Sequence, residues 1–480
     1  MKRFLAALPV VGSVAFILLY AGIALVRMRY PYELEWMEGG MVAHVRRVLE
    51  GKPLYAPPSL DFVSFLYPPG YYLASAAVAW LTGAGFLPLR LLSFVSSLGV
   101  FSLLAALARK ETGSWPDGVV AAGLFAATFA RSGGWLDLAR LDSFYMLVLL
   151  GAIFSLRHAR FRGGEVLAGL LIAAAFFTKQ SALVVVVPVL VWLFIVERRR
   201  AVRVLGVATV SIAAGMIVLE RSSGGWFGYY CFTLPAHHPR LPGGWWMFWV
   251  RDLVPALPFA LIGAVGAVVS RFRGQAPFPK ETVPDPFLLP VLAGALVASS
   301  WSVRSVYGAE VNNLLPAFAG VSLLAATWIH GGRKLAATVL AAQLAWLAYS
   351  PSAFVPTAAD RLAGDEIVRR LSAVPGEVFL PHHGYLARLA GKPEIAHTLA
   401  MDNVFLDDQG PARQRLEGEV RGALSQVRFG AAVIESDRRY ESWIVRFYVP
   451  RLPLVDAPDV FWPVSGGRLR PERLALPPAR

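Results

Sequence analysis

The chain has 480 residues, of which 56% are hydrophobic and only 16% charged, and its mean hydropathy is +0.52. This composition excludes an ordinary soluble globular domain and indicates a polytopic membrane protein. The net charge of +14 does not indicate a nucleic-acid partner, because the Lys and Arg residues form short clusters between apolar runs and no basic, aromatic module accompanies them. The single cysteine, Cys231, excludes a disulfide framework and a thiol-rich metal site.

The apolar runs predict a fold that is mainly α-helical and crosses the membrane many times. The first run continues to Val26 and meets Arg27 instead of a small-residue cleavage site, so we expect a retained first span. A bilayer core needs about 20 apolar residues per helix, and about eleven segments qualify, some with polar residues that line a cavity. They lie near residues 4–26, 89–108, 117–134, 143–156, 165–178, 181–196, 202–219, 252–269, 286–301, 311–329 and 335–349.

The run from Tyr71 to Leu81 is too short to cross a bilayer, so we predict a re-entrant or interfacial helix within a large first external loop, residues 27–88. With this assignment, the basic clusters of alternate loops all fall on one side, which identifies the cytoplasmic side. These clusters are Lys2 and Arg3, Arg109 and Lys110, Arg157 to Arg162, Arg198 to Arg203, Arg271 and Arg273, and Arg333 and Lys334. We therefore expect an inner (plasma) membrane protein with a cytoplasmic N-terminus.

The tail differs in composition from the membrane part, residues 1–350. In residues 351–480, charges occur throughout, and short apolar runs such as EVFL and AAVIE alternate with helical segments. This pattern predicts a small soluble α/β domain outside the membrane. We find no catalytic motif in it.

Two glutamates in the first external loop are the first candidates for chemistry. Glu35 and Glu38 are three residues apart, so in a helix or a tight turn both carboxylates face one side. A carboxylate at the outer membrane surface can accept a proton from a hydroxyl nucleophile. The alternative is a pair of solvated loop acids without a catalytic role.

Further candidates lie in this loop and in later outer loops. Tyr67 begins a Tyr-Pro-Pro turn, and Tyr71 suits the level of the lipid headgroups. Arg140 and Asp142 separate two short apolar segments, where ionisable residues are functional candidates, although an Arg-Asp pair that caps two helices explains them equally well. Lys179 interrupts a long apolar stretch; a cation there suits a phosphate, and the alternative is a lysine that snorkels to the interface.

Three remaining features have weaker signals. Arg304, near the outer end of a later span, has the same two interpretations as Lys179. The pairs His237-His238 and His382-His383 could indicate a metal, but adjacent side chains point apart and no third ligand is evident. We interpret both pairs as parts of polar loops and predict no metal site.

Taken in order, these segments resemble the GT-C superfamily of membrane glycosyltransferases, particularly the bacterial relatives of protein O-mannosyltransferases and of the lipid A aminoarabinose transferase. The resemblance covers roughly residues 1 to 330. It rests on E-W-M-E-G at 35–39, E-G-K-P-L-Y at 50–55, Y-P-P-G-Y-Y at 67–72, A-R-L-D-S at 139–143 and T-K at 178–179. Many relatives have an aspartate or an Asp-Glu pair where this chain has Glu-x-x-Glu. By similarity, Glu38, which precedes Gly39, is favoured over Glu35 as the working acid.

The resemblance implies a sugar donor linked to a polyprenyl phosphate, transfer outside the membrane with inversion at the anomeric carbon, and a glycan, lipid or protein acceptor. It further implies a carboxylate as the general base and cations that stabilise the departing lipid phosphate. Lys179 and Arg140 are the first candidates for these cations and Arg304 the third. Relatives differ in metal use, so the resemblance allows a divalent cation without indicating one. The supporting residues are Asp142, Tyr67 and Tyr71.

Two other classes of function remain as alternatives. A transporter or flippase for a lipid-linked or anionic substrate would use Arg140 and Lys179 to line its path, but such proteins usually contain internal repeats, and none is convincing here. A catalytically idle scaffold, whose tail binds partners in the cell envelope, is the third interpretation.

Overall fold

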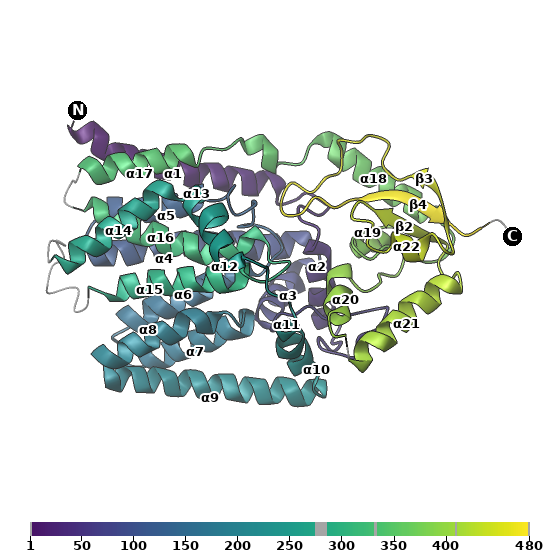
Figure 1. Cartoon of the computed structure of the whole chain (residues 1–480), viewed down its shortest axis with the longest axis horizontal. Helices are drawn as coiled ribbons and strands as arrows, with labels where there is room; N and C mark the ends of the chain where they lie inside the picture. The colour runs from purple at the N-terminus through teal and green to yellow at the C-terminus, as the bar shows by residue number, and fades with distance from the viewer. Residues whose placement is uncertain (1, 274–285, 331–333, 409, 479–480) are drawn as a thin grey trace.

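The computed structural model describes residues 2–273, 286–330, 334–408 and 410–478, with the side chains described from residue 7. Two parts lie next to each other along the long axis of the molecule (Figure 1). A helical bundle contains most of the chain up to residue 350, and a smaller part combines helices with a β-sheet. The short helices of the first loop lie between the two parts (Figure 1).

Every predicted span overlaps a helix of the bundle. The match follows from the apolar composition of these segments, which favours burial in lipid or against neighbouring helices. The helices are α1 (Lys2–Arg27), α4 (Phe86–Thr112), α5 (Trp115–Ala127), α6 (Asp142–His158), α7 (Gly164–Thr178), α8 (Ala182–Val196), α9 (Arg198–Ser223), α14 (Pro258–Phe272), α15 (Leu288–Arg304), α16 (Leu315–Ala326) and α17 (Lys334–Trp346).

Two helices have bounds that differ from the predicted spans. α5 ends at Ala127, seven residues before the predicted end at 134, and Gly133 and Gly134 both have positive φ. These glycines turn the chain into an irregular segment, residues 135–141, that no apolar pattern announces. The predicted span 252–269 is broken at Leu257, where α13 (Val254–Ala256) and α14 meet in a bend. The segment before this bend also contains α10 (Trp226–Gly228), α11 (Leu234–Ala236) and α12 (Gly244–Met247).

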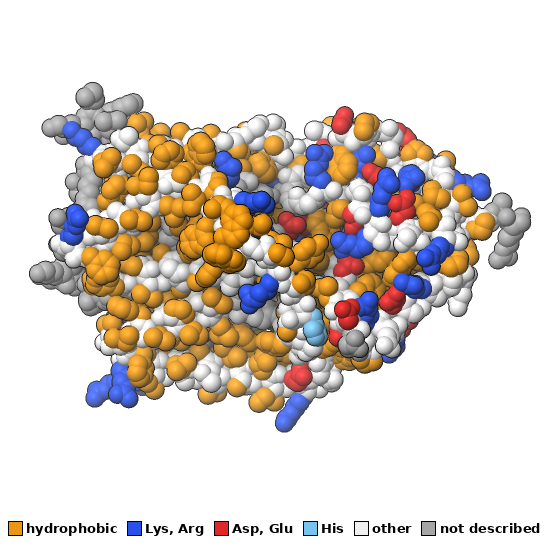
Figure 2. Space-filling view, in the orientation of Figure 1, with side chains coloured by type: hydrophobic (Ala, Val, Ile, Leu, Met, Phe, Trp, Pro, Cys, Tyr) orange, Lys and Arg blue, Asp and Glu red, His pale blue; other side chains and the backbone are white. Residues whose placement is uncertain are grey.

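The surface of the bundle is apolar, as a membrane protein requires. Figure 2 shows hydrophobic side chains over most of the bundle, whereas charged side chains gather over the C-terminal part. By length and composition, four described helices can cross a membrane, or up to six if each bent pair forms one span. The helices α7, α8 and α15 are shorter apolar helices. The count of about eleven membrane spans therefore stays a prediction. These helices nevertheless support the assignment of the chain to the class of membrane proteins.

The predicted basic loops meet at one end of the bundle. Arg157 forms an ion pair with Glu111, and Arg160 forms one with Glu197 at 2.6 Å. Arg200 donates to the carbonyl of Ala159 at 3.0 Å. Loops that are far apart in the sequence thus share one end, as the charge pattern predicts. Arg333 of the last predicted cluster lies outside the described residues.

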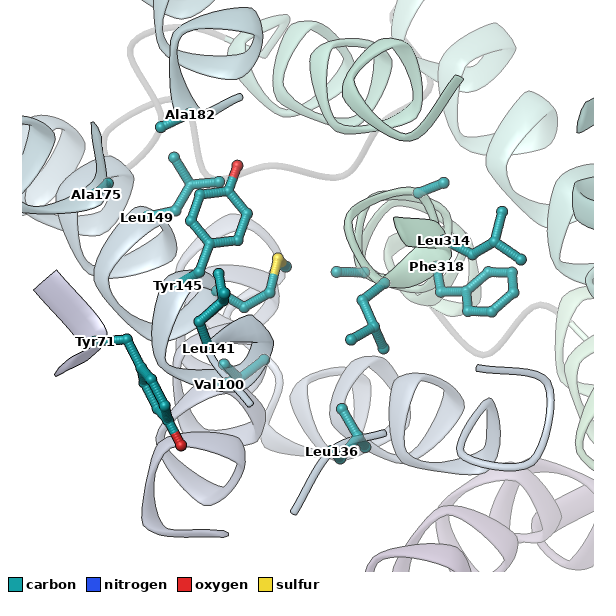
Figure 3. Close-up of a cluster of buried hydrophobic side chains, with 14 of the residues drawn as sticks. Tyr71, Val100, Leu136, Leu141, Tyr145, Leu149, Ala175, Ala182, Leu314 and Phe318 are labelled. Carbon is teal, nitrogen blue, oxygen red and sulfur yellow. The ribbon is translucent and has the colours of Figure 1, made fainter. Parts of the chain in front are cut away.

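The first loop contains two short helices, α2 (Glu38–Leu49) and α3 (Gly70–Thr82). α3 corresponds to the predicted short helix at 71–81. The expectation that Tyr71 faces the lipid headgroups is wrong, because its side chain is 1% exposed and its hydroxyl bonds to Ser93 of α4 at 3.2 Å. Figure 3 shows Tyr71 in the same buried cluster as Tyr145 and Leu149 of α6. The side chain therefore anchors α3 to the bundle.

The C-terminal part combines a four-stranded sheet with five helices among the described residues. The strand order is β1-β2-β4-β3; β1 pairs with β2 in parallel, and the other two pairings are antiparallel. All five residues of β2 are buried, which explains its continuous apolar run. The strands are β1 (Val378–Phe379), β2 (Ala431–Glu435), β3 (Val449–Pro453) and β4 (Pro471–Leu476), and the helices are α18 (Ala358–Ser372), α19 (Gly384–Leu389), α20 (Thr398–Phe405), α21 (Pro411–Ser425) and α22 (Glu441–Ile444).

A close approach between α1 and α5 gives a test of the bundle. A Cβ atom at Gly123 would collide with Ser13 of α1, so only glycine allows this contact. We expect Gly123→Val to destabilise the protein by about 1–3 kcal/mol, since overpacking must separate the two helices. Thermal unfolding in detergent would measure the loss. Gly151→Val on α6 is the matched control, because a Cβ there meets open space. Equal melting temperatures for the two variants would contradict the packing described.

Candidate active site

Glu35 lies in the irregular segment between α1 and α2, where it is fully buried. Its Oε2 accepts a hydrogen bond from Nη1 of Arg140 at 3.0 Å, while its Oε1 is buried and has no hydrogen-bond partner among the described residues. Arg140 also donates to the hydroxyl of Tyr67 at 3.3 Å. The structure thus brings together three predicted site residues from three separate segments.

The environment of Glu35 suits a proton acceptor. Burial raises the pKa of Glu35 to about 7, although the positive charge of Arg140 acts in the opposite direction. Near neutral pH, such a carboxyl is divided between its charged and neutral forms. Its free oxygen and its pKa are the properties that a general base requires.

Glu38 has a different environment, although it is also fully buried. Oε2 accepts from Nη2 of Arg90 at 2.6 Å and from the backbone N–H of Leu34 at 2.7 Å. Oε1 accepts from Nε of Arg90 at 3.0 Å and from the N–H of Ala139 at 2.6 Å. Burial alone would raise the pKa of Glu38, but Arg90 and these donors outweigh it and hold the pKa below its usual range.

The environments of the two glutamates therefore favour Glu35 over Glu38 as the working acid, which is the reverse of the order that the family resemblance favours. Both oxygens of Glu38 are engaged by the protein, so it has no free lone pair directed at a substrate. Glu35 keeps one oxygen free. The geometry favours Glu38 as an anchor of the first loop and Glu35 as the candidate for acid–base chemistry.

A second polar group lies at the N-terminus of α6. Nζ of Lys179 donates to Oδ1 of Asp142 at 3.1 Å and to Oδ1 of Asn313 at 3.0 Å. Asn312 also donates to Asp142 at 3.1 Å. Since Arg140 and Asp142 are two residues apart, this group neighbours the Glu35–Arg140 pair along the chain.

The structure places Arg304 apart from this arrangement. It forms an ion pair with Asp252 at 3.0 Å and donates to the carbonyl of Ala309. Within the described residues, no hydrogen bond or ion pair joins it to Arg140 or Lys179. Tyr71 supports the site indirectly, because Ser93, to which it bonds, donates to the carbonyl of Arg140 at 3.0 Å.

The histidine pair of the C-terminal part contacts the first loop. Nδ1 of His383 bonds to Oε2 of Glu33 at 2.6 Å, and Nε2 of His382 bonds to Asp437 at 2.7 Å. His382 also bonds to Glu435 on its other side. This pair is a buried junction between the two parts and not the polar loop that the sequence suggested.

No metal site is evident in the described ranges. Although His382, His383 and their carboxylate partners lie close together, no group of three or more His, Cys, Asp or Glu residues could hold a metal ion there. Instead, His382 bonds to Glu435 and Asp437, and His383 bonds to Glu33.

Several residues of the site were missed in the sequence. Arg90 lies within an apolar span, and an ionisable residue in such a position is a sign of function that could have identified it. The adjacent Asn312 and Asn313 are polar residues at the start of the predicted span 311–329, which is a similar sign. Glu33 gives no signal of its own, because it resembles any other loop acid.

Comparisons with known proteins give one family match. The sequence model of the dolichyl-phosphate-mannose-protein mannosyltransferase family matches residues 67–220, which is less than half of the chain. A search of curated protein sequences finds no match.

Among solved structures, ArnT from Cupriavidus metallidurans bound to undecaprenyl phosphate is similar with a TM-score of 0.63 and 13% identity, covering 96% of this chain and 97% of that chain. Its apo structure gives a TM-score of 0.61 at the same identity and coverage. The Archaeoglobus fulgidus oligosaccharyltransferase, in complex with zinc and sulfate, gives 0.47 at 12% identity over 86% and 67%, which is too low to support a conclusion.

These matches confirm the resemblance to the GT-C superfamily that the sequence indicates. The chain has a fold like that of ArnT over nearly its whole length.

The junction between the two parts predicts a dependence of stability on pH. Burial alone would lower the pKa of His382, but Glu435 and Asp437 outweigh it and raise the pKa to about 9. Protonated His382 therefore contributes stability that is complete below about pH 6.5 and is lost as the pH rises from there through 9. We expect the melting temperature to fall over this range.

The same measurement on two variants would identify His382 as the cause. In His382→Gln, the fall between pH 6.5 and 9 should be reduced, whereas exposed His237→Gln should keep the wild-type slope. Parallel curves for all three proteins would contradict the assignment.

Proposed function

We propose that the protein transfers a sugar from a polyprenyl-phosphate donor to an acceptor hydroxyl or amine on the outer face of the membrane, with Glu35 as the general base. The observation that carries the proposal is the pairing of Glu35 with Arg140 through one oxygen, while the other oxygen accepts no hydrogen bond from the described part of the chain. The fold similarity to ArnT bound to undecaprenyl phosphate supports a lipid-phosphate donor.

The proposed reaction requires few groups from the protein. The acceptor proton passes to the carboxylate of Glu35 as the acceptor atom forms a bond to the anomeric carbon. The bond between that carbon and the phosphate oxygen breaks, and its electron pair leaves with the lipid phosphate. Attack from the side opposite the leaving group inverts the anomeric centre. Proton removal by a positioned base contributes about 10²–10⁴-fold to such a step.

The developing charge on the leaving phosphate needs cations, and two are suitably placed. Arg140, beside the base, has an Nε for which the described ranges contain no hydrogen-bond partner. Lys179 is bound to Asp142 and Asn313 and is still 13% exposed, so a phosphate could replace part of this coordination. Donors fixed before the reaction stabilise charge without a cost of reorganisation. Asp142 and Tyr67 orient the two cations, while Arg304 is a more distant candidate.

The same proposal assigns the orientation in the membrane. The loop with Glu35, the segment with Arg140 and the C-terminal part lie at the end of the bundle away from the basic loops. By the positive-inside rule, that end faces outward and the N-terminus is cytoplasmic. The acceptor is then a glycan, lipid or protein outside the cytoplasm.

Neutralising the proposed base should abolish most of the transfer activity. We expect Glu35→Gln to lose about 10²–10⁴-fold of the transfer rate at pH 8, measured at a temperature where the variant is still folded, because its buried pair with Arg140 is also lost. In the wild type, the rate should rise with pH through about 7 and then level off, since only the deprotonated carboxylate accepts a proton. Release of polyprenyl phosphate from a polyprenyl-phosphate sugar, in lipid, would measure the rate.

Glu38→Gln is the matched control for the removal of a buried carboxylate charge. It leaves the guanidinium of Arg90 without a counter-charge, which costs about 3–5 kcal/mol in a buried pair, so this variant should be unstable. A stable and fully active Glu35→Gln would overturn the assignment of the base. Donor translocation without release of polyprenyl phosphate would favour a flippase.

Lys179→Met tests the proposed phosphate contact. The variant keeps the length of the side chain but removes its charge, so we expect weaker binding of undecaprenyl phosphate and a transfer rate lowered by at least about tenfold. Arg109→Met, in the last turn of α4 beside the Arg157–Glu111 pair of the basic loops, is the control and should bind the lipid phosphate normally. Binding could be followed by the thermal shift that the lipid phosphate produces. Unchanged binding in Lys179→Met would remove this residue from the donor site.

A further inference from the structure

A turn from the C-terminal part reaches into the candidate active site. It consists of residues 464–467, between β3 and β4, and is called the Ser465 turn here. The backbone N–H of Ser465 donates to the carbonyl of Leu34 at 3.0 Å, next to Glu35. The hydroxyl of Ser465 accepts from Nη1 of Arg27 at 3.0 Å. The turn is thus fixed on the first loop from two directions.

Gly466, the next residue of the turn, lies against the side chain of Glu35. A Cβ atom at this position would be 2.7 Å from Cγ of Glu35 and 3.0 Å from Cζ3 of Trp135. Its φ of +65° is also a conformation that side chains disfavour. Gly466 therefore lets the backbone pack directly on the methylene groups of the carboxylate side chain.

Hydrophobic contacts complete this side of the site. Leu34, Trp135 and Leu138 form a buried cluster with Val464 of the turn packed against it. The guanidinium of Arg140 lies over the ring of Trp135 at 5.4 Å. The Ser465 turn, Trp135 and Arg140 therefore surround Glu35, which has no exposed surface.

We propose that the Ser465 turn is a wall of the active site and that Gly466 is a positioning residue, which sets the conformation of Glu35 and keeps water from its methylene side. The proposal rests on the function proposed for Glu35 and deepens it, because it makes the C-terminal part a component of the catalytic centre. Exclusion of water on this side is also consistent with the raised pKa of the carboxyl.

The proposal predicts the effect of a single added methyl group. In Gly466→Ala, Glu35 must move away from the turn, and a displacement of about 1 Å can cost roughly 10²-fold in rate. Water then reaches the carboxyl, so the midpoint of the pH–rate curve should move below 7. The maximum rate should fall more than the apparent affinity for the donor lipid.

Two further variants separate positioning from folding. Gly391→Ala has the same backbone strain, with φ of +74° at a site of open space, and should keep both the wild-type rate and the wild-type midpoint. Ser465→Ala removes the bond to Arg27 without adding an atom near Glu35, so the loosened turn should also lower the midpoint. If Gly466→Ala does not fold, Ser465→Ala decides the question.

The outcomes distinguish this proposal from the proposed function. Infrared difference titration of the wild type against Glu35→Gln reports the protonation of Glu35 without any substrate. A wild-type midpoint and rate in both Gly466→Ala and Ser465→Ala would overturn the role of the turn. Absence of sugar transfer in the wild type would instead refute the proposed function. In that case, a shifted titration of Glu35 in the turn variants would still support the role of the Ser465 turn as a wall around Glu35.

Discussion

The structure depends on the buried ion pair between Glu38 and Arg90. A buried carboxylate is costly unless its oxygens are satisfied, and here four donors satisfy them. These donors come from the first loop, from α4 and from the segment after α5. Arg90 also binds the carbonyls of Tyr30 and Tyr32, at 2.7 Å each. One pair of charges therefore fixes the path of the loop that carries Glu35.

The helices and the common end at which their basic loops meet could be predicted from the sequence, because both follow from local properties. An apolar run defines a span, and a basic loop defines its side. The apolar run at 71–81 is too short to cross a bilayer, and this length predicts the short helix α3. The broken helices around Leu257 and the glycine turn at 133–134 could not be predicted as well, since they depend on packing between segments that are distant in the chain.

The roles of the two acids lie beyond local analysis. Glu35 and Glu38 are alike in the sequence, and only their partners distinguish them: Arg140 is 105 positions from Glu35, and Arg90 is 52 positions from Glu38. The family resemblance favours Glu38, whereas the contacts in the structure lead us to propose Glu35. The contact of the histidine pair with the first loop could not be predicted for a similar reason, because its partner Glu33 lies 350 positions away.

The bond between Arg27 and Ser465 joins residues 438 positions apart. Arg27 ends α1, whereas Ser465 lies in the turn before β4. During biosynthesis, the acidic loop consequently remains incomplete until the segment with Ser465 has been translated and has packed against the end of α1. A chain truncated before this segment could form its helices, but its candidate site would lack this wall.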